Sequence, residues 1–140
     1  MKNANKVLTK MGFYKVGTFY IKDQKFVIDL EKKYSSLQEV IYVHTIDDEI
    51  IRVGSSKNIL KSRMKSWERD VSKSLKGQKS STPLWEGEIW NKILKNKVGT
   101  FYAREGTTII TPCGKMNSYL TEESYLIGKL LPKMNRSKHR

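Results

Sequence analysis

The chain has 140 residues, a length typical of one domain with its own hydrophobic core rather than of two. Its 27 Lys and Arg against 14 Asp and Glu leave a formal net charge of +13, which favours a polyanionic partner such as nucleic acid over an acidic or membrane-embedded role. A single cysteine excludes an intramolecular disulfide and indicates a reducing, cytoplasmic setting, and no apolar run approaches the length of a membrane span.

Residues 1–39 predict a short basic lead followed by a β-hairpin. The runs Val16–Ile21 and Lys25–Leu30 are rich in β-branched and aromatic residues, and the polar residues between them supply a turn. The hexapeptide KVGTFY occurs at residues 15–20 and again at residues 97–102. Because the match does not extend beyond either copy, two similar strands are predicted rather than an internal duplication.

The segment Val40–Trp67 predicts two strands and a helix in direct succession. Val40–Ile46 and Glu49–Val53 are β-branched runs on either side of an acidic turn, a pattern typical of a hairpin. Gly54 then predicts a bend that leads into the helix. Strand, strand and helix therefore form one unit around which the rest of the chain is organised.

A basic helix is predicted after this bend, with Ser55, Ser56 or Asn58 as its N-cap. Apolar residues recur along it at steps of three and four, so they share one face. These residues are Leu60, Met64, Trp67 and Val71. Arg63 lies beside that face rather than opposite it.

Lysines and arginines outnumber acids from residue 57 to residue 79, and the helix runs into a polar loop at Ser72–Thr82. Two interpretations remain open: a solvated helix face, or a surface that contacts phosphates. In the second interpretation the candidate substrate-binding residues are Lys57, Lys61, Lys65 and Lys73.

A helix and a hairpin are predicted between residues 82 and 114. Thr82-Pro83 is a favourable helix start, and the helix Leu84–Asn96 carries an apolar stripe. The stripe consists of Trp85, Ile89 and Ile93, widened by Trp90 and Leu94, and we interpret its tryptophans as core residues rather than base-stacking platforms. Val98–Arg104 and Thr107–Thr111 predict a hairpin around Glu105-Gly106 that ends at a Pro-Cys-Gly turn.

The last predicted helix, from Thr121 as N-cap to Pro132, carries two adjacent acids with different orientations. On a helical projection Glu123 lies among the inward-facing apolar residues, whereas Glu122 lies about 100° away toward the flank. An inward carboxylate is costly unless a cation or hydrogen bonds compensate it, which favours Glu123 as a metal ligand. Plain capping by a partly exposed acid is the alternative.

Together these motifs resemble the GIY-YIG nuclease superfamily over Val40 to Asn135. Val40-Ile41-Tyr42 occupies the place of the first tripeptide, Arg52-Val53-Gly54 that of the second, and Arg63 follows on the next helix. The family's late helix carries one Glu and is followed by a Leu-Ile pair, a Pro and an Asn, matched here by Glu123, Leu126-Ile127, Pro132 and Asn135. Two departures exist: Arg52 replaces the second Tyr, and Arg63 is one residue further from Gly54 than in the commonest pattern. Small restriction endonucleases of the superfamily are similar to this chain in both respects.

The resemblance implies an α/β fold with a small three-stranded mixed sheet flanked by helices and extended by β-hairpins. It implies one nuclease domain over residues 1–140, with residues 1–39 as an N-terminal hairpin extension and residues 40–135 as the catalytic core. The implied catalytic residues are Tyr42 as general base, Arg52, Arg63 as phosphate ligand, Glu123 and Asn135 as a brace. Glu123 is also the implied ligand of one Mg²⁺, for which Mn²⁺ can substitute.

The implied activity is Mg²⁺-dependent hydrolysis of double-stranded DNA by an endonuclease. Because no second DNA-binding module is recognised, a type II restriction enzyme acting as a homodimer is favoured, and a phage-type nicking endonuclease is the nearest alternative. A non-catalytic nucleic-acid-binding protein on the same scaffold is the alternative from a different class, since the second Tyr is missing.

Overall fold

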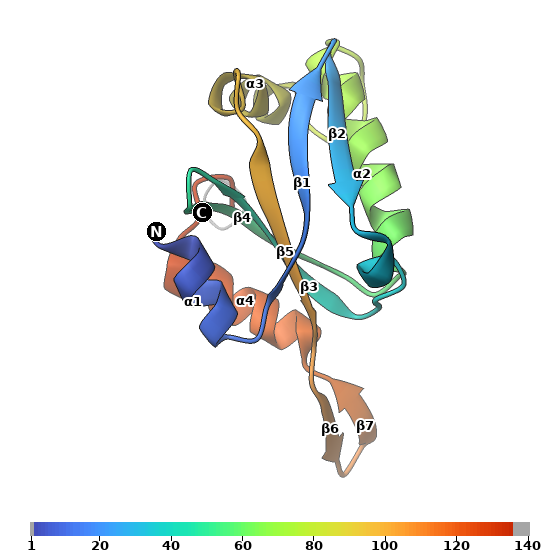
Figure 1. The fold of residues 1–140 in the computed structure, drawn as a ribbon. Coiled ribbons are helices and arrows are strands. Elements are labelled where there is room, and N and C mark those ends of the chain that lie inside the picture. Colours follow the sequence, from blue (N-terminus) through green and yellow to red (C-terminus); the bar gives the residue numbers. More distant parts are fainter. Residues whose placement is uncertain (1, 136–140) are drawn as a thin grey trace.

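The computed structural model describes residues 2–135, which form a central sheet with helices on both faces (Figure 1). The helices are α1 (Ala4–Lys10), α2 (Leu60–Leu75), α3 (Leu84–Ile93) and α4 (Tyr119–Leu130). The strands are β1 (Tyr14–Lys22), β2 (Lys25–Leu30), β3 (Val40–Ile46), β4 (Glu49–Ser56), β5 (Gly99–Glu105), β6 (Thr108–Thr111) and β7 (Gly114–Asn117). No helix in this part of the chain is long and apolar enough to cross a membrane.

The main sheet has five strands in the order β2-β1-β5-β3-β4. The predicted α/β class, with helices beside a sheet and hairpin extensions, is confirmed. The sheet differs from the expected three-stranded mixed one, because the N-terminal hairpin joins it through β1 and β5, and the described strand pairs are all antiparallel. The N-terminal hairpin is thus part of the same sheet as β3 and β4.

The repeated hexapeptide KVGTFY explains how that junction forms. Its two copies belong to β1 and to the start of β5, and they pair antiparallel with Thr18 opposite Thr100. Phe19 lies opposite Gly99, where a Cβ atom would lie 2.2 Å from the Phe19 ring. Gly99 therefore makes room for the aromatic ring of Phe19.

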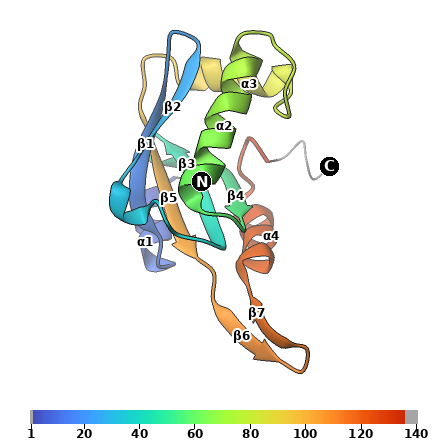
Figure 2. The same ribbon diagram turned by 90° about the vertical axis from the view of Figure 1, so that its right-hand side faces the viewer.

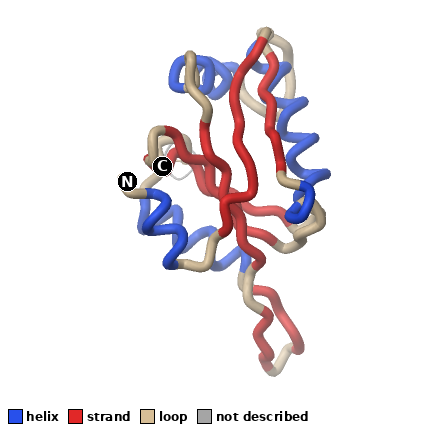
Figure 3. Tube along the Cα trace, viewed as in Figure 1, coloured by secondary structure: helices blue, strands red, loops and turns tan. Residues whose placement is uncertain are grey.

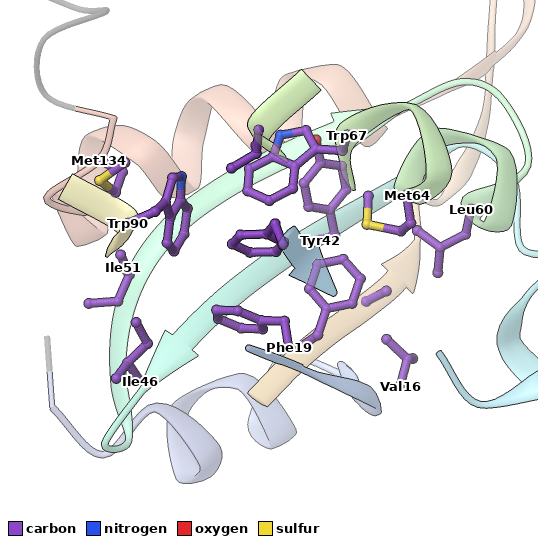
Figure 4. Packing of buried hydrophobic residues seen from close by; sticks show 14 of the residues in the cluster. Val16, Phe19, Tyr42, Ile46, Ile51, Leu60, Met64, Trp67, Trp90 and Met134 are labelled. Carbon is purple, nitrogen blue, oxygen red and sulfur yellow. The ribbon is translucent and has the colours of Figure 1, made fainter. Parts of the chain in front are cut away.

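Alternate residues of β3 divide between two hydrophobic layers, as strand geometry requires. Ile41 and Val43 face α1 and α4, while Val40 and Tyr42 face α2 and α3. Every residue of β3 is buried, because both faces of this strand are covered. Figure 4 shows the α2/α3 layer, in which Tyr42, Trp67 and Trp90 lie close together.

The β3–β4 hairpin forms as predicted, but β4 continues through Gly54 to Ser56. The predicted bend at Gly54 is therefore wrong: this glycine is paired with Tyr42 inside the sheet. The turn residues Asp47 and Asp48 both adopt positive φ angles, 52° and 58°. Two such residues in succession form the type I′ turn that suits the twist of a two-residue hairpin.

Four helix predictions need correction. The basic lead contains α1, which buries Ala4 and Leu8. Helix α2 begins at Leu60 without a side-chain N-cap, because Ser55 and Ser56 belong to β4. In α3 the face is rotated from the predicted stripe: Trp90 is fully buried, whereas Trp85 remains 41% exposed. Helix α4 likewise begins before Thr121 and has no side-chain cap.

The predicted hairpin between Val98–Arg104 and Thr107–Thr111 is wrong. Strand β5 pairs with β1 and β3, and β6 pairs instead with β7 across the Pro112-Cys113 turn. Figures 1 and 3 show this small β6–β7 hairpin extending away from the main sheet beyond α4. Long-range pairing through β3 overrides the local turn signal at Gly106.

Candidate active site

Tyr42 lies at the centre of the α2/α3 layer, on β3, and is 1% exposed. Its cross-strand partner is Gly54, where a Cβ atom would lie 2.6 Å from the tyrosine ring and 2.7 Å from its hydroxyl oxygen. Only glycine therefore leaves room for the Tyr42 side chain against β4. The first and second tripeptides are joined here by a steric requirement as well as by strand pairing.

Two arginines approach the Tyr42 hydroxyl, Arg52 from β4 and Arg63 from α2. Burial alone raises the pKa of Tyr42, but the charges of both arginines and the hydrogen bonds that they donate outweigh it. The pKa of Tyr42 is consequently lowered from its usual 10.0. Cations within hydrogen-bond reach favour the tyrosinate form, so this hydroxyl releases its proton more easily than an ordinary tyrosine.

The two arginines differ in their access to solvent. Arg52 is 6% exposed, and its guanidinium carbon lies 5.6 Å from the centre of the Trp67 ring and 6.0 Å from that of Tyr42. Arg63 is half-buried on the flank of α2. Arg63 is therefore the member of the pair that a phosphate can reach from solvent, while Arg52 lies underneath.

The two acids of α4 have different partners. Glu122 forms an ion pair with Arg104 of β5 and accepts a hydrogen bond from Ser118. Burial raises the pKa of Glu122, but these contacts outweigh it and hold the pKa below its usual value. Glu123 instead accepts one hydrogen bond from the Ser55 hydroxyl of β4, at 2.8 Å, and has no ion pair within residues 2–135.

Glu123 is thus the acid whose charge is not balanced by a protein cation. No cluster of three or more His, Cys, Asp or Glu suited to a metal occurs in the described part of the chain. Mg²⁺ at phosphoryl-transfer sites typically binds one or two carboxylates and keeps several waters for the remaining positions. The half-buried Glu123 carboxylate beside a serine hydroxyl fits such an ion.

Asn135 braces the outer edge of β4. Its side-chain oxygen accepts a hydrogen bond from the Val53 amide at 2.8 Å, and its amide nitrogen donates to the Val53 carbonyl at 2.9 Å. The Met134 amide also donates to the Ile51 carbonyl at 3.0 Å. Because Val53 lies between Arg52 and Gly54, the segment after α4 fixes the backbone that carries the second tripeptide.

The four predicted substrate-binding lysines are exposed but lie in two places. Lys57 precedes α2 and lines a separate hollow with Asn58 and Ser62. The other three line a groove between α2 and β2, which we call the basic groove. Its charged lining is Lys25, Lys32, Lys61, Lys65, Arg69, Lys73 and Lys76, with Asp29 and Glu68.

The basic groove and the Tyr42 site lie on opposite flanks of α2. Arg63 is about 200° around the helix from Lys61. Figure 2 shows α2 between β2 on one side and β4 with α4 on the other. Within the groove, Glu68 accepts a hydrogen bond from the Ile28 amide, so this acid also protects the free edge of β2. The remaining charge of the groove is predominantly positive.

Three side chains at this site were not predicted from sequence: Ser55, Trp67 as a partner of Arg52, and His44. Ser55 is one of the three predicted N-cap candidates, but it lies in β4, and its place one residue after Gly54 puts it on the other face of that strand. His44 follows Tyr42 by two residues, and strand alternation therefore places it on the same face. That spacing was the available signal for His44.

No protein-family model matches the chain, and no curated protein matches it. Two solved structures are similar in fold. A mutant of bacteriophage T4 EndoII, with a glutamate replaced by alanine, has a TM-score of 0.66 at 19% identity over 94% of this chain and 97% of that chain. The restriction endonuclease HPY188I in complex with product DNA has a TM-score of 0.55 at 18% identity over 92% of this chain and 80% of that chain.

Proposed function

We propose that the chain is a divalent-metal-dependent endonuclease of the GIY-YIG type that hydrolyses phosphodiester bonds of double-stranded DNA. The observation that carries this proposal is the buried Tyr42 hydroxyl between two arginines, whose charges lower its pKa. The fold likeness to two endonucleases adds support, since it covers nearly the whole chain. Phosphodiester hydrolysis requires a general base to activate water and positive charge to stabilise the phosphate. Tyr42, the two arginines and a carboxylate able to bind a metal supply these groups.

In this mechanism Tyr42 accepts the proton of the attacking water. A phosphate that binds Arg63 accepts hydrogen bonds from N–H groups that otherwise donate to Tyr42. Substrate binding therefore frees the Tyr42 oxygen to accept a proton. Arg52 remains beneath the ring and holds positive charge beside the tyrosinate. Its role replaces that of the second family tyrosine with a fixed cation.

Glu123 would hold Mg²⁺, or Mn²⁺ in its place, and the chemistry that such an ion would supply is stabilisation of negative charge on the leaving oxygen. Ser55 orients the Glu123 carboxylate through its hydrogen bond. Asn135 acts indirectly by fixing the backbone of Val53 between Arg52 and Gly54. Tyr42, Arg52, Arg63, Glu123 and Asn135 thus have separate roles in one nuclease domain spanning residues 1–140.

DNA contacts are assigned to Lys57 beside the site and to Lys61, Lys65 and Lys73 in the basic groove. Because the groove and the site flank α2, a duplex that lies across this helix brings one phosphate backbone to each. Contacts of this kind set affinity and salt dependence but carry no sequence information.

A type II restriction role with a homodimer is the favoured biological setting. One site cuts one strand, and a two-fold dimer is the simplest way to cut both strands at related positions. Exposed apolar side chains suited to such an interface lie on α3 and on the β6–β7 hairpin: Leu84, Trp85, Ile89, Ile109, Ile110 and Met116. A cytoplasmic location fits the single, exposed Cys113.

The direct test is cleavage of supercoiled plasmid with Mg²⁺, with EDTA as the control. Glu123→Ala is expected to abolish cleavage while DNA binding persists, because the carboxylate contributes to the metal and not to phosphate affinity. Glu122→Ala is the matched control: it loses the Arg104 ion pair and some stability but remains active at low temperature. If Glu122→Ala is dead and Glu123→Ala is active, the metal ligand is assigned one residue out.

The alternative of a non-catalytic DNA-binding protein rests on the absence of the second tyrosine at Arg52. It predicts plasmid binding by gel shift without cleavage in Mg²⁺ or Mn²⁺. A phage-type nicking enzyme predicts instead that nicked circles accumulate and are not converted to linear DNA.

A further inference from the structure

Behind Tyr42, on the same face of β3, lies a histidine that the proposed mechanism does not use. His44 is fully buried and is surrounded by aromatic rings. Its imidazole stacks on Trp67, with ring centres 4.8 Å apart and planes at 27°, and it meets Phe101 at 4.9 Å and Phe19 at 5.0 Å. Trp90 and Tyr42 complete the enclosure at 5.4 and 5.8 Å.

A polar ring in this position is costly. Both ring nitrogens of His44 lack a hydrogen-bond partner among residues 2–135. A buried polar group left unpaired costs about 1–3 kcal/mol, and such groups are rare in folded proteins. A phenylalanine would fill the same aromatic enclosure without that cost, so packing alone does not account for a histidine.

One unpaired donor near His44 lies directly across the hairpin. His44 and Arg52 are opposite each other in the β3–β4 ladder, and cross-strand neighbours of this kind have side chains in contact range. Arg52 Nε and Nη1 are buried and are also without a partner in the described chain. Burial, and then the charge of Arg52, holds the pKa of His44 well below its usual 6.5, so the imidazole is neutral and has one nitrogen free to accept.

Trp67 contacts both His44 and Arg52. The indole stacks on the His44 ring, and the Arg52 guanidinium carbon lies 5.6 Å from its ring centre. The N–H groups of a guanidinium lie in its own plane. When the guanidinium lies over an aromatic face, these groups can still donate hydrogen bonds to neighbouring acceptors. The Tyr42 hydroxyl accepts a hydrogen bond from Arg52, and the neutral imidazole of His44, opposite Arg52 in the ladder, is a second group able to accept.

We propose that His44 is a positioning residue: one water accepts a hydrogen bond from the Arg52 guanidinium and donates one to the neutral His44 imidazole, which holds that cation against the Tyr42 hydroxyl. The consequence for Tyr42 follows from geometry. If Arg52 drifts away from the hydroxyl, the tyrosinate loses a charge and a donor, and burial again dominates. The catalytic consequence rests on the proposed nuclease function, whereas the effect on Tyr42 does not.

The test compares His44→Phe, which fills the aromatic enclosure, with His44→Gln, which retains an acceptor. The readout is the pKa of Tyr42, followed by NMR of tyrosine labelled with ¹³C at Cζ and assigned with Tyr42→Phe. His44→Phe is expected to raise the Tyr42 pKa by about one unit, which corresponds to about 1.4 kcal/mol of lost stabilisation of the tyrosinate. His44→Gln is expected to restore at least half of the shift.

Phe19→Leu is the matched control, because Phe19 contacts the His44 ring and has no polar side-chain atom. It is expected to lower stability without moving the Tyr42 pKa. The single-turnover cleavage rate at saturating DNA should fall with His44→Phe by about tenfold, in step with the pKa shift, while the binding constant for DNA is unchanged.

Four outcomes separate the two proposals. A wild-type Tyr42 pKa in folded His44→Phe overturns the positioning role, and so does a shift of equal size in Phe19→Leu. A shifted Tyr42 pKa in a protein that never cleaves DNA supports the positioning role and refutes the nuclease. If His44→Phe does not fold, ¹⁵N NMR of the wild-type imidazole decides: an acceptor-type nitrogen supports the proposal, and two unbonded nitrogens overturn it.

Discussion

Asn135→Ala is expected to lower the free energy of unfolding by about 2–4 kcal/mol. The substitution removes two hydrogen bonds, at 2.8 and 2.9 Å, from a side chain that is 2% exposed. Each bond contributes about 1 kcal/mol, and the Val53 amide and carbonyl that remain add the cost of buried unpaired groups. Water can enter at the outer edge of β4 and limit this cost, which keeps the sum near the middle of the range. For a chain of this size the midpoint of thermal unfolding should fall by about 10 °C.

The measurement is urea unfolding followed by tryptophan fluorescence, since Trp67 and Trp90 are buried in the core. Asn135→Asp separates the two bonds, because a carboxylate can accept from the Val53 amide but cannot donate to the carbonyl. Asn91→Ala on the exposed face of α3 is the matched control and should change stability by less than about 0.5 kcal/mol. If Asn135→Ala loses no more than this control, the segment after α4 is held by other contacts and the bracing role is wrong.

Three further predictions follow from the site. Arg52→Lys should retain measurable cleavage and Arg52→Ala or Arg52→Tyr should lose most of it, whereas wild-type activity of Arg52→Ala would make this cation incidental. Because the pKa of His44 is depressed in the folded state, protonation of this residue favours the unfolded state, and the free energy of unfolding falls as the pH drops below 6.5. The fall is at most about 1.4 kcal/mol per pH unit. His44→Phe should remove this pH dependence, measured by urea unfolding at a series of pH values from 7 to about 4.5. Light scattering at moderate salt should give twice the monomer mass of 16.3 kDa, with linear plasmid product and little nicked intermediate; a monomer that accumulates nicked circles would contradict the restriction role.

Local signals in the sequence were sufficient for the β3–β4 hairpin. Val40–Ile46 is a continuous β-branched and aromatic run, and the two aspartates that follow tolerate positive φ. They were also sufficient for the burial of the α2 face that contains Leu60 and Trp67. In each case one element carries its own periodicity and needs no distant partner to define it.

Signals failed where the partner of an element is far away in sequence. The stretch Val98–Thr111 contains two β runs and an intervening Gly, a local pattern for a hairpin, yet β5 is taken up between β1 and β3. Both faces of α3 carry apolar residues, so its own periodicity could not decide whether Trp85 or Trp90 would face the core. The buried position of Trp90 is set by Phe19, Phe26 and Trp67 from other elements.

In the candidate site, too, local sequence predicts some features and distant elements set others. Strand β4 shows this. Residue alternation along β4 directs Arg52 and Gly54 to the α2 side of the sheet, with Tyr42, and Ser55 to the α4 side, where it contacts Glu123. In the proposed nuclease, where Tyr42 is the base and Glu123 the metal ligand, these two groups lie on opposite faces of the sheet. They can act on one phosphate only at an edge strand, where no further strand separates the two faces. Strand β4 is that edge, and it stays open beyond Val53 because Asn135 occupies only the preceding part of it. The spacing of the second tripeptide therefore specifies both halves of the site, provided that β4 is not paired on its outer side.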